Sequence, residues 1–307
     1  MRDHFVKRLE TLASEDSSIM LTTADMGFGV FDAYRKLYPS QFINVGIAEQ
    51  NMTSMAAGMA LEGLKVFTYS ISNFPTLRCL EQIRNDICYH GANVNIVAIG
   101  GGFSYGSLGM SHHATEDLAI LRSLPEMVVV SPTSLWEASE ATEAITNTNG
   151  PCYLRLDKSH GNDFRKEDEE FQLGRVRILK EGIDCYILVT GGILEEVETA
   201  VKSLALKGID AGIISVHTIK PFDKKTIVDI ARITPAIITV EEHSVNGGLG
   251  GITAETLCDA GVYPKKMLRI GLEDTYSCIV GDQKYLRKRY EMDSESICHR
   301  IEKILKG

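Results

Sequence analysis

Short apolar runs alternate with longer amphipathic stretches along the first half of the chain. The strand-like runs cover residues 18–24, 42–46, 65–71, 93–99, 127–131 and 151–156. The stretches between some of them carry small and apolar residues at helical spacing, over 47–63, 75–91 and 131–147. The first ends on Gly63, and the second begins near Pro75 and closes on Gly91, as helices often do. Apolar strands separated by helices predict a mostly parallel sheet covered on both faces.

The alternation breaks once, in the polar, charge-dense stretch "SHGNDFRKEDEEFQLGR" (159–175). It then restarts, with strand-like runs at 185–190, 211–219, 235–242 and 265–272. Helices are expected at 193–206, near 224–232, after "GGLGG" (247–251), and twice at the C-terminal end. We therefore predict two consecutive three-layer α/β domains, at 1–162 and 177–307, joined by a charged linker at 163–176.

Composition narrows the class of protein. The 307 residues carry a net charge of −9, which argues against general binding to nucleic acid or to anionic membranes. No apolar run is long enough for a transmembrane helix, and the charged N-terminal segment has no signal-peptide core, so we expect a cytoplasmic protein. None of the seven cysteines forms a CxxC pair, which favours reduced, mostly buried thiols over disulfides or zinc.

Glycine clusters follow three strand candidates, at 100–102, 191–192 and 247–251. None has the G-x-G-x-x-G spacing of a dinucleotide-binding loop. Tight strand-to-helix turns are the better interpretation, and a dinucleotide fold remains an alternative.

Two stretches contain candidate catalytic groups. In "FINVGIAEQNM" (42–52), Glu49 follows a strand and starts a helix rich in small residues. It is either an ordinary helix-start carboxylate or a desolvated acid with a raised pKa, suited to proton exchange with a nitrogen heterocycle. In "GMSHHATEDLAILRSLPEM" (109–127), His112 and His113 lie in a Gly-containing loop, at the position where α/β sheets bind ligands.

Five segments together resemble the transketolase family of thiamine diphosphate enzymes. They are "FINVGIAEQNMTSMAAGMALEG", "FPTLRCLEQIRNDI", "GMSHHATEDLAILRSLPEM", "GPCYLRL" and "VEEHSVNGGLGG". The resemblance spans nearly the whole chain and is to the separate subunit that holds only the pyrimidine-binding and C-terminal domains.

The resemblance implies roles for individual residues. Glu49 matches the acid that hydrogen-bonds N1′ of the cofactor's aminopyrimidine, and Phe74 matches the aromatic residue that stacks on that ring. Asp25 and Ile47 are placed beside the cofactor, with Asp25 at the subunit contact. His112 matches a substrate-site histidine that assists proton transfers. His113 stands where many members have Gln and is also expected to bind substrate.

The sequence departs from the family in two respects. It contains no Gly-Asp-Gly motif, so the resemblance implies that Mg²⁺ (or Ca²⁺) and the diphosphate are held by a partner N-terminal subunit, in an α2β2 heterotetramer. In the substrate channel, Gly100 replaces a His or Arg, Leu108 replaces an acid, and Lys158 replaces a phosphate-binding Arg. We therefore expect two-carbon ketol transfer that involves an atypical sugar.

Two other functions remain open at this stage. The same scaffold could perform decarboxylative acyl transfer from pyruvate or another 2-oxo acid, as deoxyxylulose-phosphate synthases and dehydrogenase β subunits do. A non-catalytic subunit is less favoured, because Glu49 and Phe74 are both present. The segment "VEEHSVNGGLGG", including His243, is expected to be structural.

Overall fold

The first half of the chain supplies all strands but one of a sheet whose neighbouring strands are parallel apart from that one, the edge strand β10 (Thr218–Lys220) from the second half. In the computed structural model, which describes residues 1–158 and 161–306, this sheet has the order β10-β5-β6-β4-β3-β1-β2. Ser159 and His160, which the sequence places near the linker, lie outside the described residues. The elements are α1 (Arg2–Glu15), β1 (Ile19–Thr23), α2 (Asp32–Leu37), β2 (Phe42–Asn44), α3 (Glu49–Leu61), β3 (Lys65–Ile71), α4 (Leu80–Gln82), β4 (Val94–Ile99), α5 (Asp117–Ser123), β5 (Val128–Val130), α6 (Leu135–Thr146) and β6 (Cys152–Leu156).

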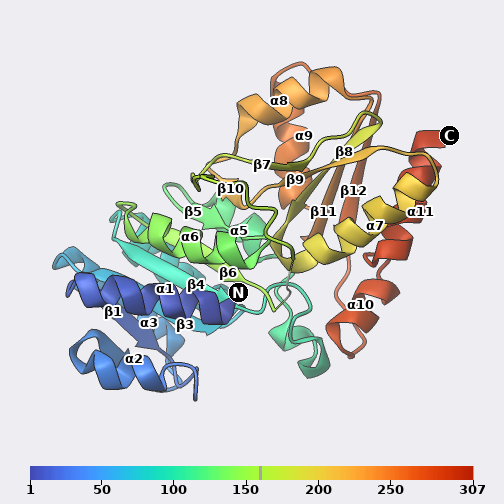
Figure 1. The fold of residues 1–307 in the computed structure, drawn as a ribbon. Coiled ribbons are helices and arrows are strands. Elements are labelled where there is room, and N and C mark those ends of the chain that lie inside the picture. The colour runs from blue at the N-terminus through green and yellow to red at the C-terminus, as the bar shows by residue number, and fades with distance from the viewer. Residues whose placement is uncertain (159–160, 307) are drawn as a thin grey trace.

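The second half builds a five-stranded sheet of order β12-β11-β8-β9-β7, in which only β7 is antiparallel to its neighbour. Figure 1 shows the two sheets in adjoining lobes, with α7 and α11 on one side of the second sheet and α8 and α9 on the other. The elements are β7 (Arg177–Lys180), β8 (Cys185–Thr190), α7 (Leu194–Leu206), β9 (Ala211–Ser215), β10 (Thr218–Lys220), α8 (Lys224–Ile233), β11 (Ala236–Ser244), α9 (Leu249–Asp259), β12 (Lys266–Leu272), α10 (Gln283–Arg289) and α11 (Ser294–Lys306). The predicted fold class is confirmed.

The single strand predicted at 211–219 is wrong. It is divided into β9, which pairs with β8, and β10, which crosses to the first sheet and pairs antiparallel with β5. Between them the backbone changes partner, since Val216 N donates to Val189 O and His217 O accepts from Ser131 N, both at 2.8 Å. The apolar pattern continues through the break because both short strands are buried.

The helix predicted from Pro75 is also less regular than expected. Pro75 precedes the helical segment, which begins with a 3-10 turn at Leu77–Cys79, continues through α4 and widens into a π-helix at Ile83–Cys88. Neither α2 nor β7 was predicted. The stretch from Gly161 to Gly174 contains no helix or strand, in keeping with a linker, although the predicted domain bounds themselves remain a prediction.

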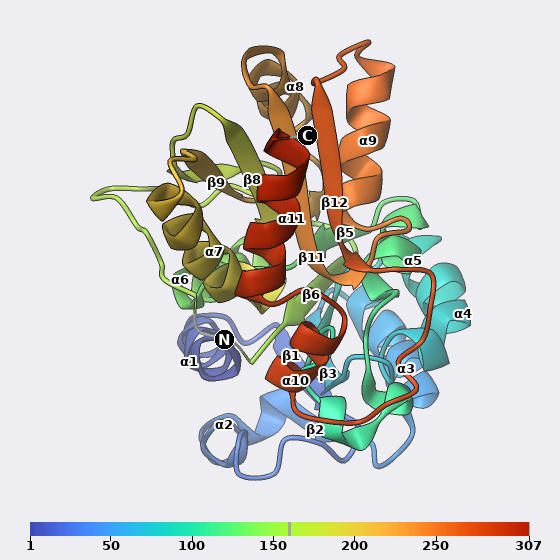
Figure 2. The same cartoon turned by 90° about the vertical axis from the view of Figure 1, so that its right-hand side faces the viewer.

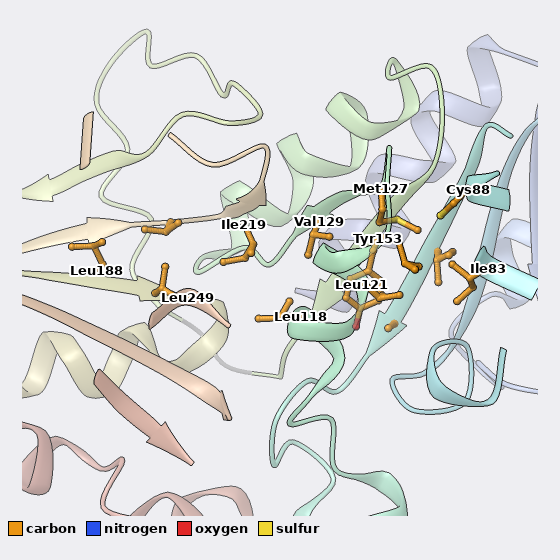
Figure 3. Close-up of a cluster of buried hydrophobic side chains, with 14 of the residues drawn as sticks. Ile83, Cys88, Leu118, Leu121, Met127, Val129, Tyr153, Leu188, Ile219 and Leu249 are labelled. Carbon is orange, nitrogen blue, oxygen red and sulfur yellow. The ribbon is translucent and has the colours of Figure 1, made fainter. Parts of the chain in front are cut away.

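The two lobes share one apolar core. Leu118, Leu121 and Val129 from the first lobe belong to the same buried cluster as Leu188, Ile219 and Leu249 (Figure 3). The cluster therefore spans the contact between the lobes, and its burial stabilises that contact. Within the described residues all seven cysteines are free, five of them buried, and no helix is long and apolar enough to cross a membrane.

Candidate active site

The predicted site residues gather at the carboxyl edge of the first sheet. Asp25 follows β1, Glu49 lies just after β2, and Phe74 follows β3. Gly100 and Lys158 follow β4 and β6 in the same way. Because these strands are parallel neighbours, residues far apart in the sequence share one edge, where α/β sheets bind ligands.

Glu49 is the first residue of α3 and only 4% of its surface is exposed. Its Oε2 accepts a hydrogen bond from Arg78 Nη1 at 2.9 Å, and the helix N-terminus favours the negative charge. The tight turn before it is held by Asn44, whose Oδ1 accepts from Gly46 N at 3.0 Å. Glu49 is therefore a buried, paired acid rather than an exposed helix-start residue.

Arg78 links Glu49 to the aromatic residue of the site. Its guanidinium carbon lies 4.5 Å from the centre of the Phe74 ring, while the His112 ring meets Phe74 edge-on with centroids 5.2 Å apart. His112 Nδ1 lies 3.0 Å from Ser111 Oγ. The structure thus brings together Glu49, Phe74 and His112, and it adds Arg78, which the sequence analysis did not identify.

Asp25 and Ile47 lie in the loops that follow β1 and β2, at the same edge of the sheet. Asp25 adopts a left-handed backbone (φ 53°) and is held by Asn44, which accepts from Asp25 N at 2.9 Å and donates to its Oδ1 at 3.2 Å. Ile47 is 80% exposed and Phe28, beyond Asp25, is 78% exposed. Large apolar side chains in water at a site edge are typical of an interaction surface.

The two adjacent histidines differ in environment. His112 is partly exposed, whereas His113 is buried with its Nε2 3.3 Å from Gly106 O and its ring edge-on to Phe103 at 5.1 Å. Burial lowers the pKa of His113, which favours the neutral ring. His113 therefore packs inside the loop, while His112 faces Phe74.

Tyr105 covers the position at which this sequence has Gly100. Gly100 has φ +90°, and a Cβ there would overlap the Tyr105 ring. Lys158 Nζ lies 4.0 Å from the centre of the same ring, and burial lowers the pKa of Lys158. Tyr105 and Lys158, with Arg2, line a cavity of about 310 Å³. Leu108, 54% exposed, lies in the 3-10 turn that follows.

The second lobe holds the loop that carries His112. The buried Glu242 carboxylate accepts hydrogen bonds from Phe103 N, from Gln283 Nε2 at 2.9 Å and from Arg287.

Glu241 caps α9 by accepting hydrogen bonds from Leu249 N and Gly250 N, each at 2.7 Å, and burial raises the pKa of Glu241. The glycines after β11 thus form a tight strand-to-helix turn, as predicted.

His243 is fully buried between the lobes. Its Nε2 lies 3.9 Å from Asp117 Oδ1 of the first lobe, and its Nδ1 lies 2.7 Å from Ser244 O. This position agrees with the structural role expected for His243.

Family models match almost all of the chain. The transketolase pyrimidine binding domain matches residues 1–162, and the transketolase C-terminal domain matches residues 174–297. These domains are those of thiamine diphosphate-dependent enzymes.

Individual proteins agree with these matches. A "putative transketolase C-terminal section" of Methanocaldococcus jannaschii is 38% identical, over 98% of this chain and 95% of its own. One of the subunits of an apulose-4-phosphate transketolase from Phocaeicola vulgatus is 35% identical, over 97% and 95%. A 1-deoxy-D-xylulose-5-phosphate synthase of Geobacter metallireducens is 33% identical, but this chain spans only 48% of it. A solved structure described as "Split gene transketolase, inactive beta4 tetramer" superposes with a TM-score of 0.90 at 34% identity, over 99% and 98% of the two chains.

The fold and the site therefore define a subunit of a thiamine diphosphate-dependent transferase. The chain belongs to the transketolase family, with its pyrimidine-binding and C-terminal domains, and it aligns over nearly its whole length with a relative named as a transketolase C-terminal section, which confirms the resemblance seen in the sequence.

Proposed function

We propose that this chain is catalytically active only with a partner subunit, and that the pair transfers a two-carbon ketol unit from a ketose donor to an aldehyde or ketone acceptor. The observation that carries the proposal is the group formed by Glu49, Arg78 and Phe74. It supplies a buried carboxylate beside an aromatic face, at the ligand-binding edge of the sheet.

The geometry around Arg78 fits the aminopyrimidine of thiamine diphosphate. The Arg78 guanidinium is a planar hydrogen-bond donor that lies over Phe74 and donates to Glu49. An aminopyrimidine is also planar and donates a hydrogen bond from N1′ when that atom is protonated. Arg78, about half exposed, can swing outward, since it is a long side chain at the surface. The same two contacts are then open to the cofactor.

Each residue has a proposed task. Glu49 holds the proton at pyrimidine N1′, and Phe74 orients the ring by stacking. When bound, the cofactor supplies the electron sink for breaking and making carbon–carbon bonds. His112 moves protons at substrate oxygens, and Asp25 and Ile47 support the cofactor from the subunit contact.

Two features support the requirement for a partner: the missing diphosphate-binding motif and the exposed apolar side chains near the site. It has no Gly-Asp-Gly motif, so we assign Mg²⁺ (or Ca²⁺) and the diphosphate to an N-terminal subunit. Phe28, Ile47, Leu108 and Met110 are each more than half exposed near the site, where a partner would cover them. We propose an α2β2 assembly in the cytoplasm.

The substrate is proposed to be an atypical sugar. Tyr105 occupies the space beside Gly100, and Lys158 offers a single ammonium where a bidentate guanidinium would grip phosphate more firmly. The relative from Phocaeicola vulgatus is named for apulose 4-phosphate, which is consistent with a ketose donor outside the common pentose phosphates.

A titration tests the proposal directly. The isolated chain and the chain reconstituted with its partner are each titrated with thiamine diphosphate and Mg²⁺, and ketol transfer is then assayed. We expect tight binding and turnover only in the complex. Turnover by the isolated chain would contradict the need for a partner, and release of CO₂ from carboxyl-labelled pyruvate would favour the decarboxylative alternative.

A further inference from the structure

A large groove in the second lobe shares no residue with the candidate active site. Its volume is about 1010 Å³, and it is bordered by β12, the end of α10 and α11. Figure 2 shows α11 beside β12, with α10 near the start of α11. Small-molecule sites are typically about 300–1,000 Å³, so this hollow could hold a drug-sized ligand.

The lining is cationic although the chain is acidic overall. It contains Lys265, Lys266, Arg289, His299, Arg300 and Lys303, against only two acids, Glu273 and Glu291. The whole chain carries a net charge of −9, so this concentration of positive charge is local. A concave surface of one sign attracts ligands of the opposite sign.

The basic and the buried apolar residues of α11 lie on different faces of the helix. His299, Arg300 and Lys303 lie on the face that lines the groove, and Ile297 and Ile301 lie on the buried face. Neither of its acids lines the groove: Glu295 lies in the first turn, and Glu302 is bonded to Lys207 at 2.6 Å and Lys306 at 2.7 Å. Of the ionisable residues in this part of the helix, only the basic ones therefore line the groove.

Several of these cations are available to a ligand. Lys266 is engaged, because its Nζ donates to Leu305 O at 3.2 Å, and Arg300 lies 3.9 Å from Glu273. Lys265, Arg289 and Lys303 are exposed, and none of them forms an ion pair with any residue that the structure describes.

Apolar side chains also line the groove. Met267, Leu268 and Ile304 are only partly buried there. Tyr290 is fixed by a 2.9 Å hydrogen bond from its hydroxyl to Ser277 Oγ and by stacking on Phe103, with ring centroids 5.5 Å apart. The groove thus combines a rigid aromatic ring and an apolar floor with free cations.

We propose that this groove binds a small molecule that carries both a planar apolar ring and several negative charges, such as a nucleoside polyphosphate. The charges pair with Lys265, Arg289 and Lys303, and the ring lies on the apolar floor. An inorganic anion would contact the cations of the groove but not its apolar floor.

The test uses calorimetric titration of the full chain, repeated with the reconstituted complex, at about 0.15 M salt, where charges beyond about 8 Å are screened. The probes are ATP, inorganic tripolyphosphate and adenosine. We expect one saturable ATP site per chain and weaker binding of the other two probes. Lys265→Glu with Lys303→Glu should weaken ATP binding at least ten-fold.

A matched control is Lys202→Glu with Lys224→Glu, two exposed positions outside the groove that change the net charge equally. ATP should bind this control as it binds the unmodified chain. The proposal is overturned by the absence of saturable ATP binding, by an equal loss in the control, or by tripolyphosphate binding as tightly as ATP.

Discussion

The Arg78 guanidinium lies 2.9 Å from the Glu49 carboxylate and 4.5 Å from the centre of the Phe74 ring. It therefore occupies both contacts that we assign to the cofactor's aminopyrimidine. A cofactor that binds there must first displace Arg78 from a partly exposed ion pair, which costs about 0.2–1 kcal/mol.

Arg78→Met keeps the length of the side chain but removes this competition. We expect thiamine diphosphate to bind the reconstituted complex about 1.4- to 5-fold more tightly, which corresponds to the strength of the ion pair. Quenching of protein fluorescence on cofactor binding measures the effect. Weaker binding in the variant would show that Arg78 assists the cofactor instead.

Glu49→Gln removes the acid but keeps its size. We expect activity of the complex to fall by about 10²–10⁴, because general acid–base catalysis contributes that much. The melting temperature should change little, because the glutamine Oε1 can still accept the hydrogen bond from Arg78, and Arg78, about half exposed, keeps its charge in contact with water. Glu62→Gln, at the exposed end of the same helix, is the control and should retain full activity.

Substitution of His112 should affect catalysis, whereas substitution of His113 should affect stability. His112→Ala should reduce kcat by about 10²-fold or more and leave the melting temperature nearly unchanged. His113→Ala should instead destabilise the fold by about 1–3 kcal/mol, because it removes a buried ring that packs on Phe103. Steady-state kinetics and thermal unfolding of both variants check this, and the reverse pattern would contradict the assignment.

His217 should make stability depend on pH. It is fully buried near Glu137, Arg177 and Glu169, and burial lowers its pKa to about 4. The unfolded chain binds the proton more readily, so this contribution is complete above about pH 6.5 and is lost as the pH falls towards 4. The shift corresponds to on the order of 3 kcal/mol.

Urea unfolding of His217→Asn at pH 7 and at pH 5 measures this contribution. The variant should lose less stability between the two values than the unmodified chain does. His90→Asn, at an exposed histidine, should leave the pH dependence unchanged. If the free energy of unfolding fell equally between pH 7 and pH 5 in His217→Asn and in the unmodified chain, groups other than His217 would be responsible for the loss of stability in acid.

Arg287 should be essential for the contact between the second lobe and the His112 loop. It is 1% exposed and is bonded to Glu242, to Glu195 at 3.0 Å and to Gly192 O at 3.2 Å. Arg287→Met leaves the Glu242 charge buried with one fewer partner and should cost about 3–5 kcal/mol. Chemical unfolding measures it, with the exposed neighbour substituted as Lys288→Met expected to be neutral.

Local patterns in the sequence determined most of the elements. The apolar strands β1, β3, β4 and β8 lie close to their predicted positions, because burial on both faces leaves an uninterrupted apolar run. The motif around Glu49 identified the acid at the start of α3, and together with four other segments it identified the family.

Tertiary structure decided which segments and side chains meet. The run at 211–219 has the pattern of one strand, yet its two halves join different sheets, since pairing depends on partners far away in the chain. Arg78 is 29 residues from Glu49 in the sequence and reaches it only because β2 and β3 both flank β1. Tyr105 fills the space above Gly100 for a similar reason, because the loop after β4 folds back over its own start. Periodicity records whether a residue is buried, but not which neighbour buries it.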